Sequence, residues 1–349
     1  MARLSFQTAR IAGVVTTVGG QYRSAADLQS EFGFSDTELE RLQKTLGLQS
    51  RYVAAPGVTT SDLCLNSAQA LLAGLGVAPD AIDAVIMVTQ TPDFRAPSTA
   101  IHLAHRLGCN TGVMAFDIAL GCSGYVYGLN SAFALVNGGL QNVLLVVGDV
   151  ASRFADRNDR AFAPLMGDAG AATLVTRAAA ASPSPSHFCL HSDGAGYRAL
   201  YMPGSGVREE AAPRGPLGFM HMNGAEVFNF TIKVVPSMFS EIFEYAAVAP
   251  ESIDYFVLHQ PNKYILHNIQ KRLGLPKERV PDQTQAIYGN QNAASIPGTI
   301  NGFLSEGLHG AGSKKLLLAG FGIGLSWGAA VLDVDGLYAP PVIIDERKE

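Results

Sequence analysis

The segment Val77–Asp83 reads VAPDAID and leads into the apolar run AVIMVT at Ala84–Thr89. A second copy, VAPESID at Val248–Asp254, lies 171 residues further on and leads into the apolar run YFVL at Tyr255–Leu258. Short, continuous apolar runs are typical of strands buried on both faces in a helix-covered sheet. The repeat therefore predicts an α/β protein built from two related halves.

Further landmarks recur in the same order in both parts of the chain. After each apolar run come, in order, an Arg-Leu-Gly at the end of a helix pattern, a glycine-rich segment, a strand, and the start of a final strand. The pairs are Arg106–Gly108 and Arg272–Gly274, Gly121–Gly124 and Gly289–Asn292, Asn142–Val147 and Lys315–Ala319, and Gly167–Val175 and Leu325–Asp333. The alternative is that βα units generally look alike, but six landmarks in one order favour a gene duplication. The Pro- and Ser-rich stretch Ala178–Ser186 predicts a linker between halves 1–180 and 187–349.

Composition and charge narrow the class of protein. Of the 349 residues, 48% are hydrophobic and 16% are charged, which excludes intrinsic disorder. Lys and Arg number 25 against 30 Asp and Glu, so a nucleic-acid-binding function, which usually needs a basic balance, is disfavoured. The chain has no apolar run of membrane-spanning length and no signal-peptide core at its N-terminus, so we expect a cytoplasmic protein without a membrane segment. None of the four cysteines forms a C-x-x-C pair, and we expect neither a metal site nor a disulfide framework.

Three candidate catalytic residues lie at predicted strand ends or helix starts. In parallel α/β sheets, active sites lie beyond the carboxyl ends of the strands. Cys122 directly precedes a predicted buried helix over Ser123–Val136, where the helix dipole and free N–H groups favour the thiolate that a nucleophile needs. His259 follows the strand of the second half, and Asn290 occupies the segment equivalent to that of Cys122. A site between the two halves would bring all three together.

Each of these residue types also has an ordinary structural interpretation. A free cysteine is often a small buried hydrophobe, which is the interpretation taken here for Cys64, Cys109 and Cys189. A histidine at a strand end is often structural, and an asparagine after glycine often serves a turn. The glycine-rich segment Gly320–Gly328 is followed by a strand rather than a helix, which argues against a dinucleotide-binding loop. Such a turn can instead present a backbone N–H to an oxyanion.

From Ile11 to Val334 the chain resembles the β-ketoacyl-ACP synthase III family of the thiolase superfamily. Six motifs in the family's order carry the resemblance. They are D-x-x-x-x-C-S-G around Cys122, MGDAGAA around Asp168, NGAEVF at Asn223–Phe228, HQPN at His259–Asn262, GNQNAASIP at Gly289–Pro297 and GFGIGLSWG at Gly320–Gly328.

The resemblance implies a thiolase-like α/β fold, in which two pseudo-duplicated αβαβα halves form a five-layered core. It also implies a condensing acyltransferase that needs no metal or cofactor. Cys122 would accept an acyl group, with the backbone N–H groups of Cys122 and Ile323 as its oxyanion hole. His259 and Asn290 would stabilise the enolate formed as a malonyl-type thioester loses CO₂, and a β-ketoacyl product would result. The pathway would be fatty-acid initiation or, somewhat favoured, specialised polyketide- or quinolone-type metabolism.

The resemblance also implies substrate and partner contacts. The substrate-binding residues would be Phe94, Ala96, Arg160, Asn223, Asn262 and Phe321. The acyl donors would be thioesters of coenzyme A or acyl carrier protein. The protein would be a homodimer that pairs an edge strand of each N-terminal half, and Asn142–Val147 is the predicted edge strand because it is apolar and free of proline.

Some positions depart from the family pattern. The tryptophan that often stacks on the adenine of coenzyme A is absent, and Arg41 stands near its place. Gln291-Asn292 replaces the usual Thr-Ser after the candidate asparagine, and Ala96 replaces an aromatic residue that often closes the acyl pocket. The alanine predicts acceptance of medium or long acyl primers.

Two other functions fit the same residues. One is an acyl-thioester transferase or hydrolase that uses Cys122 without decarboxylation. The other is a non-catalytic partner subunit of another ketosynthase, although such a subunit would be free to lose the three residues. A papain-like protease shares the order Cys, His, Asn, but its local cysteine signature is missing.

Overall fold

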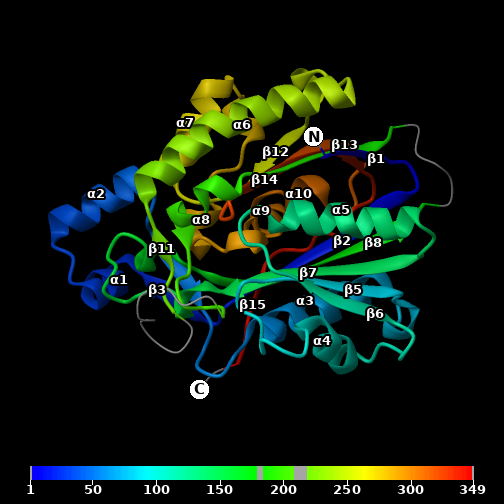
Figure 1. Ribbon diagram of the computed structural model, residues 1–349, viewed down its shortest axis with the longest axis horizontal. Helices are drawn as coiled ribbons and strands as arrows, with labels where there is room; N and C mark the ends of the chain where they lie inside the picture. Colours follow the sequence, from blue (N-terminus) through cyan, green and yellow to red (C-terminus); the bar gives the residue numbers. More distant parts are fainter. Residues whose placement is uncertain (1, 179–183, 208–217, 348–349) are drawn as a thin grey trace.

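The computed structural model describes residues 2–178, 184–207 and 218–347. Two stacked β-sheets are separated by one layer of helices and covered by helices on both outer faces (Figure 1). The predicted five-layered thiolase-like fold is thereby confirmed. Most of the linker predicted at Ala178–Ser186 lies outside the described residues, and Ser186 already begins a strand. Of the helices that the structure describes, none is long and apolar enough to cross a membrane.

The two sheets share one pairing scheme. In the first sheet, β5 (Ala84–Val88) runs parallel to β7 (Asn142–Val150), which runs antiparallel to β8 (Asp168–Arg177). In the second sheet, the same arrangement is formed by β12 (Tyr255–Leu258), β13 (Lys314–Gly322) and β14 (Ser326–Val334). The first sheet contains, in order, β15 (Ile343–Ile344), β2 (Ala9–Val18), β8 (Asp168–Arg177), β7 (Asn142–Val150), β5 (Ala84–Val88) and β6 (Met114–Ile118). The second contains β1 (Ala2–Phe6), β9 (Ser186–Ser192), β14 (Ser326–Val334), β13 (Lys314–Gly322) and β12 (Tyr255–Leu258). The chain ends cross over, because β1 joins the second sheet and β15 joins the first.

The strand Asn142–Val147 is not an edge strand, so that prediction was wrong. It forms most of β7, which is hydrogen-bonded on both sides, to β5 and to β8. Its apolar character reflects burial in the middle of the sheet, since Val143–Val147 are almost completely buried. The edge strands of this sheet are the two-residue β15 and the longer β6, in which Met114 is 46% exposed.

The helices form three layers around the sheets (Figure 1). The layer between the sheets holds α5 (Gly124–Asn137) and α9 (Ser295–Phe303), which contact strands of both. The outer faces are covered by α3 (Thr60–Leu75) and α4 (Thr99–Leu107) on the first sheet, and by α6 (Gly224–Ala246) and α7 (Lys263–Leu273) on the second. The smaller elements include α1 (Ala25–Phe32), α2 (Asp36–Leu46), α8 (Thr284–Tyr288), α10 (Ser305–Leu308), the antiparallel pair β3 (Gln21–Ser24) and β4 (Ser50–Val53), and the pair β10 (Leu200–Tyr201) and β11 (His221–Met222).

Small residues let the central helix α5 pack tightly against the first sheet. A Cβ atom added at Gly128 would lie 2.7 Å from Leu145 Cδ1 and 2.8 Å from Val88 Cγ2. These distances are far below ordinary carbon contacts, so a larger residue would push the helix away. Because Cys122 directly precedes α5, this packing also fixes the position of the candidate nucleophile.

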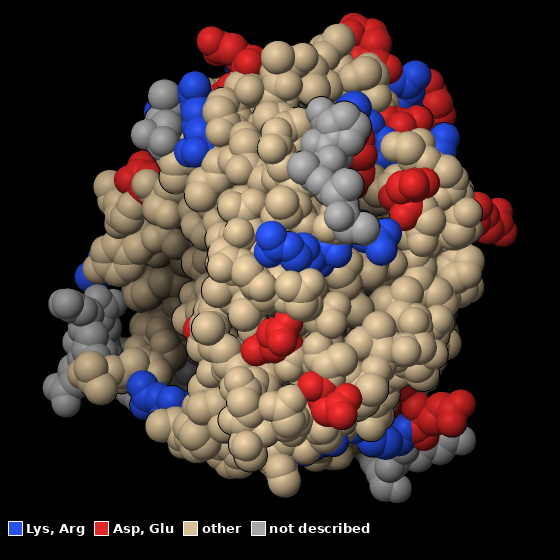
Figure 2. Space-filling model, turned by 90° about the vertical axis from the view of Figure 1, so that its right-hand side faces the viewer, with Lys and Arg blue, Asp and Glu red and all other residues tan. Residues whose placement is uncertain are grey.

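The acidic and basic side chains are scattered over the face shown in Figure 2 rather than gathered by sign. Most of that face is formed by uncharged residues, as expected for a chain in which 16% of the residues are charged.

Candidate active site

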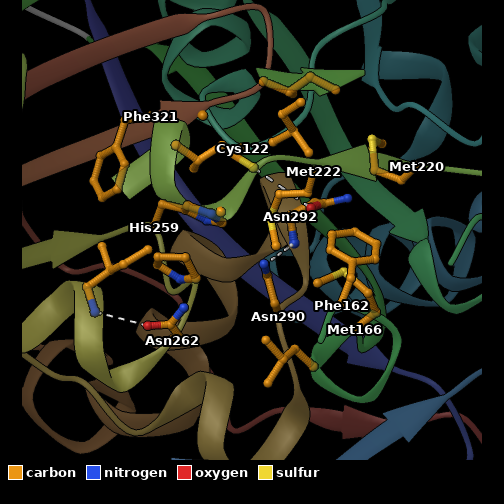
Figure 3. Close-up of a pocket in the computed structure, with 18 of the residues that line it drawn as sticks. Cys122, Phe162, Met166, Met220, Met222, His259, Asn262, Asn290, Asn292 and Phe321 are labelled. Atoms are coloured by element: carbon orange, nitrogen blue, oxygen red, sulfur yellow. Dashed lines mark hydrogen bonds between the residues drawn. The ribbon is translucent and has the colours of Figure 1, made fainter. Parts of the chain in front are cut away.

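A cavity of about 110 Å³ lies where the two halves meet, and Cys122, His259 and Asn290 all line it (Figure 3). Cys122 precedes α5, His259 follows β12, and Asn290 follows α8. The cavity is also lined by Asn262 and Phe321. Ile323, predicted as an oxyanion-hole residue, lines it too. The structure therefore brings together six of the predicted site residues.

Two glycines let β13 approach Cys122 closely. A Cβ atom added at Gly322 would lie 2.7 Å from Cys122 Cβ and 2.8 Å from Cys122 Sγ. One added at Gly320 would lie 2.9 Å from the carbonyl oxygen of Cys122. The glycine-rich segment of the second half thus forms a wall of the nucleophile's site.

Cys122 is only 8% exposed, and this burial dominates its acidity. Burial raises the pKa of the Cys122 thiol to about 11, while the backbone N–H groups of Ile323 and of Cys122 itself act in the opposite direction. The sequence predicted a helix start that favours the thiolate. The helix start is present, but desolvation of the charged form outweighs it, and the resting residue is a thiol near neutral pH.

His259 is held rigidly and is neutral. Its backbone N–H donates to the carbonyl oxygen of Ala319 at 2.8 Å, at the end of β12. Its Nδ1 lies 2.8 Å from Ser295 Oγ, which also lies 2.8 Å from the carbonyl oxygen of Asn292. Burial lowers the pKa of His259 to about 3, against a backbone hydrogen bond with Asn292 that raises it. The single proton of the Ser295 hydroxyl can go to only one of these two acceptors, and when it goes to Nδ1 the proton of the neutral His259 ring lies on Nε2.

Asn290 is positioned by the first half of the chain. Its N–H donates to the carbonyl oxygen of Leu165 at 2.7 Å, and Gly167 N–H donates back to the Asn290 carbonyl at 3.0 Å. Gly167 belongs to the MGDAGAA motif, and a Cβ atom there would lie 2.1 Å from the carbonyl oxygen of Tyr288. The side-chain Oδ1 of Asn290 accepts the N–H of Asn292 at 3.0 Å, which leaves its Nδ2 donor for a ligand.

Two of the predicted substrate-binding residues are asparagines that cap helices. Asn262 caps α7 by accepting the Ile265 N–H at 2.9 Å, and it lies at the cavity (Figure 3). Asn223 caps α6 and exchanges hydrogen bonds with Glu226, outside the cavity lining.

Arg160 and Arg41 also lie outside the cavity. Arg160 is paired with Glu38 at 3.1 Å, and its guanidinium lies 4.7 Å from the Phe34 ring centroid. Arg41 is an exposed residue of α2.

Phe94 and Ala96 lie on the loop between β5 and α4 and are exposed. Phe94 lines a second cavity of about 780 Å³. This cavity and the catalytic one share five lining residues: Gln90, Phe154, Leu200, Met220 and Ile323. Ala96 stands beside this second cavity in the chain without lining it.

Sequence reasoning missed two residues next to Cys122. Asn292 was noted only as a departure from a family pattern, yet its Oδ1 lies 3.9 Å from Cys122 Sγ. Asp149 is completely buried and accepts a hydrogen bond from Asn292 Nδ2 at 3.1 Å. Burial raises the pKa of Asp149 to about 6, while its several donors lower it. A signal existed, because Asp149 is the one charged residue of the apolar strand NVLLVVGDV.

The duplicated five-layered fold, with a cysteine, a histidine and an asparagine at the junction of the halves, defines a condensing enzyme of the thiolase class. Comparison with known proteins agrees. The models described as 3-oxoacyl-[acyl-carrier-protein (ACP)] synthase III and its C-terminal part match residues 116–194 and 243–334. The chain belongs to the 3-oxoacyl-ACP synthase III family and is an acyltransferase.

Three similar proteins illustrate this. A "Putative 3-oxoacyl-[acyl-carrier-protein] synthase 3" of Campylobacter jejuni is 34% identical over 99% of both chains. The crystal structure of a 3-oxoacyl-(acyl-carrier protein) synthase from Burkholderia xenovorans LB400 is 36% identical, with a TM-score of 0.93 and 99% of both chains covered. The priming β-ketosynthase from the R1128 polyketide biosynthetic pathway is 27% identical, with a TM-score of 0.84 over 96% of this chain and 98% of that one. The family acts on thioesters of coenzyme A and acyl carrier protein.

Proposed function

We propose that this enzyme transfers an acyl group to Cys122 and then condenses it with a malonyl-type thioester, giving a β-ketoacyl product. The observation that carries the proposal is the convergence of a buried cysteine, a neutral histidine and an oriented asparagine amide on one cavity. Each of the two half-reactions passes through an oxyanion, and the cavity offers a separate pair of N–H donors to each.

In the first half-reaction, Cys122 Sγ attacks the carbonyl carbon of an acyl thioester. The S–C bond to the carrier breaks, and the carrier leaves as a thiol that takes up the proton of Cys122. The backbone N–H groups of Cys122 and Ile323, which already act on the sulfur, stabilise the tetrahedral oxyanion. Loss of one such donor typically lowers the rate by about 10²–10³.

In the second half-reaction, the malonyl-type thioester loses CO₂ and its carbonyl oxygen gains enolate charge. His259 Nε2–H and Asn290 Nδ2–H donate to that oxygen. The low pKa of His259 serves this role, because a neutral imidazole donates a hydrogen bond without protonating the enolate. The enolate carbon then attacks the acyl carbon on Cys122, a C–C bond forms, and the cysteine sulfur leaves.

The acyl donor is a thioester of acyl carrier protein or of coenzyme A, and its pantetheine arm passes Asn262 and Phe321 at the cavity. Arg160 and Asn223, which lie outside the cavity lining, bind the carrier part of the donor. The Arg160 side chain is half exposed and paired with Glu38. This position favours acyl carrier protein as the donor over coenzyme A, whose adenine Arg160 would otherwise contact.

The acyl chain extends from Cys122 toward the second cavity, past the wall that the two cavities share. Phe94 lines this cavity, and Ala96, on the same exposed loop, carries no bulky side chain that could close an acyl pocket. Medium or long primers are therefore accepted, since each buried CH₂ contributes about 0.8 kcal/mol of binding. This favours specialised polyketide- or quinolone-type metabolism over fatty-acid initiation, and the likeness to a priming polyketide ketosynthase supports it.

The protein acts as a homodimer, and β6 rather than β7 is the pairing strand. An unpaired edge strand presents free N–H and C=O groups that a second copy can satisfy. Exposed Met114 on β6 supports this assignment.

Intact-protein mass spectrometry tests the function. The enzyme is incubated with acyl thioesters of two to twelve carbons on coenzyme A and on acyl carrier protein, and malonyl thioester is then added. An acyl adduct that is discharged as a β-ketoacyl product with CO₂ release supports condensation. Discharge as free acid or as another thioester, without CO₂, would establish the transferase or hydrolase alternative. Absence of any adduct would favour the non-catalytic subunit.

A further inference from the structure

Asn292 occupies a special backbone conformation beside the nucleophile. Its φ is 49°, and Ala247 is the other non-glycine residue with a positive φ in the described ranges. Asparagine tolerates this left-handed region better than most residues. The conformation turns the side chain of Asn292 toward Cys122 (Figure 3).

Asn292 contacts all three candidate catalytic residues, through different groups. Its side-chain Oδ1 lies 3.9 Å from Cys122 Sγ and accepts the thiol hydrogen. Its backbone N–H donates to Asn290 Oδ1 at 3.0 Å. Its backbone carbonyl oxygen lies 2.8 Å from Ser295 Oγ, the group in contact with His259 Nδ1. The side chain therefore serves the cysteine, and the backbone serves the other two.

Asp149 fixes which way the Asn292 amide points. Asp149 Oδ1 accepts hydrogen bonds from the Thr89 hydroxyl at 3.0 Å, from the Gln90 N–H at 2.7 Å, and from the Thr91 N–H and hydroxyl, each at 3.1 Å. Its other oxygen, Oδ2, accepts Asn292 Nδ2 at 3.1 Å. A buried carboxylate oxygen needs a donor there, so the amide nitrogen faces Asp149 and the amide oxygen faces the sulfur.

We propose that Asn292, oriented by Asp149, is a positioning residue for Cys122, whose amide oxygen holds the thiol for the acylation half-reaction. This inference rests on the proposed function, in which Cys122 is the acylated residue. The role is confined to acylation, since the contacts to Asn290 and Ser295 are made by the backbone and survive removal of the side chain by glycine, which adopts the same positive φ without strain.

The amide takes no proton in this role. The hydrogen of Cys122 Sγ is shared with Asn292 Oδ1 in the resting enzyme and ends on the sulfur of the leaving carrier. A hydrogen bond to the neutral form of an acid disfavours the charged form, so Asn292 holds the thiol protonated until a thioester arrives. Removal of the acceptor should therefore make the free thiol more acidic but less well aimed.

Asn292→Gly tests the proposal through two separate readouts, because glycine removes the side chain and keeps the positive φ. The first is the pH dependence of Cys122 alkylation by iodoacetamide, located by peptide mass, whose midpoint should move to lower pH. The second is the split between half-reactions. The kcat/KM of acylation by acyl-coenzyme A should fall by about 10²-fold, as expected for a misplacement of about 1 Å, while CO₂ release from malonyl thioester stays at the wild-type rate.

Two further variants complete the experiment. Asp149→Asn places an amide donor against Asn292 Nδ2 and removes a charge that raises the pKa of Cys122. The pH at the midpoint of Cys122 alkylation should therefore also fall in this variant. Asn130→Ala is the matched control, because Asn130 lies on α5 and its Oδ1 has no hydrogen-bond partner among the described residues. It should leave both half-reactions and the alkylation profile unchanged.

Parallel loss of acylation and decarboxylation in Asn292→Gly, or an unmoved alkylation midpoint in both network variants, would overturn the positioning role. If Asn292→Gly fails to fold, Asp149→Asn decides the same question. Failure of the proposed function gives a different result, namely wild-type enzyme that forms no acyl adduct on Cys122.

Discussion

Gly322→Ala should disable the nucleophile without touching the groups that decarboxylate the extender. The added methyl would lie 2.7 Å from Cys122 Cβ and 2.8 Å from Cys122 Sγ. Carbon atoms pack at about 3.5–4.0 Å, so the two segments must separate by roughly 0.7–1 Å. A misplacement of that size lowers a rate by about 10²-fold, which is roughly 3 kcal/mol of transition-state stabilisation. The same movement displaces the N–H of Ile323, the next residue.

The assay is the rate of acyl-adduct formation on Cys122, followed by intact-protein mass, beside CO₂ release from malonyl thioester. Gly312→Ala is the control, because a Cβ atom at Gly312 meets nothing within 4 Å. We expect acylation to fall by at least about 10²-fold in Gly322→Ala and to stay unchanged in Gly312→Ala. Wild-type acylation by Gly322→Ala would refute the claim that this close approach sets the position of the sulfur.

Three more predictions concern pH, chain length and assembly. The pKa of His259 is about 3 in the folded protein and 6.5 ordinarily, so as the pH falls the unfolded chain binds a proton at this residue before the folded protein does. The free energy of unfolding that His259 contributes is therefore complete above pH 6.5 and is lost as the pH falls toward 3. This contribution is at most roughly 5 kcal/mol. In His259→Gln, the free energy of unfolding measured with urea should depend less on pH between 6.5 and 3. The same pH dependence in the variant and the wild type would contradict a neutral, buried His259. Ala96→Phe should shift the kcat/KM of Cys122 acylation toward short primers, and a wild-type enzyme whose rate already falls steeply beyond four carbons would show that the pocket is closed. Met114→Lys on β6 should convert a dimer into single chains in sedimentation at micromolar concentration, whereas a wild-type protein that sediments as one chain would rule out the dimer.

Much of the fold was predictable because the chain repeats itself. The segments VAPDAID and VAPESID precede β5 and β12, and these two strands hold equivalent places in the two sheets. An apolar run does not reveal whether a strand is central or at an edge, since the signal is burial of both faces. That is why Asn142–Val147 was mistaken for an edge, while the partly exposed edge strand β6 was passed over.

The candidate site was only partly predictable, for a related reason. Cys122, His259 and Asn290 stood out because they lie in motifs at strand or helix ends. Asp149 and Asn292 are 143 positions apart, and only the folded chain places them together beside Cys122. The pKa of Cys122 could not be predicted from the sequence either. It depends mainly on how deeply the thiol is buried, and a cysteine at the start of a helix can be buried or exposed.

The central claim is that Cys122 carries the acyl group while His259 and Asn290 drive decarboxylation, and one paired measurement tests it. Cys122→Ala and His259→Ala are each incubated with an acyl thioester and malonyl thioester, and adduct mass and CO₂ release are recorded from the same samples. The division of labour predicts no adduct on Cys122→Ala, and a full adduct without condensation on His259→Ala. An adduct on Cys122→Ala, or condensation by His259→Ala at near the wild-type rate, would contradict it.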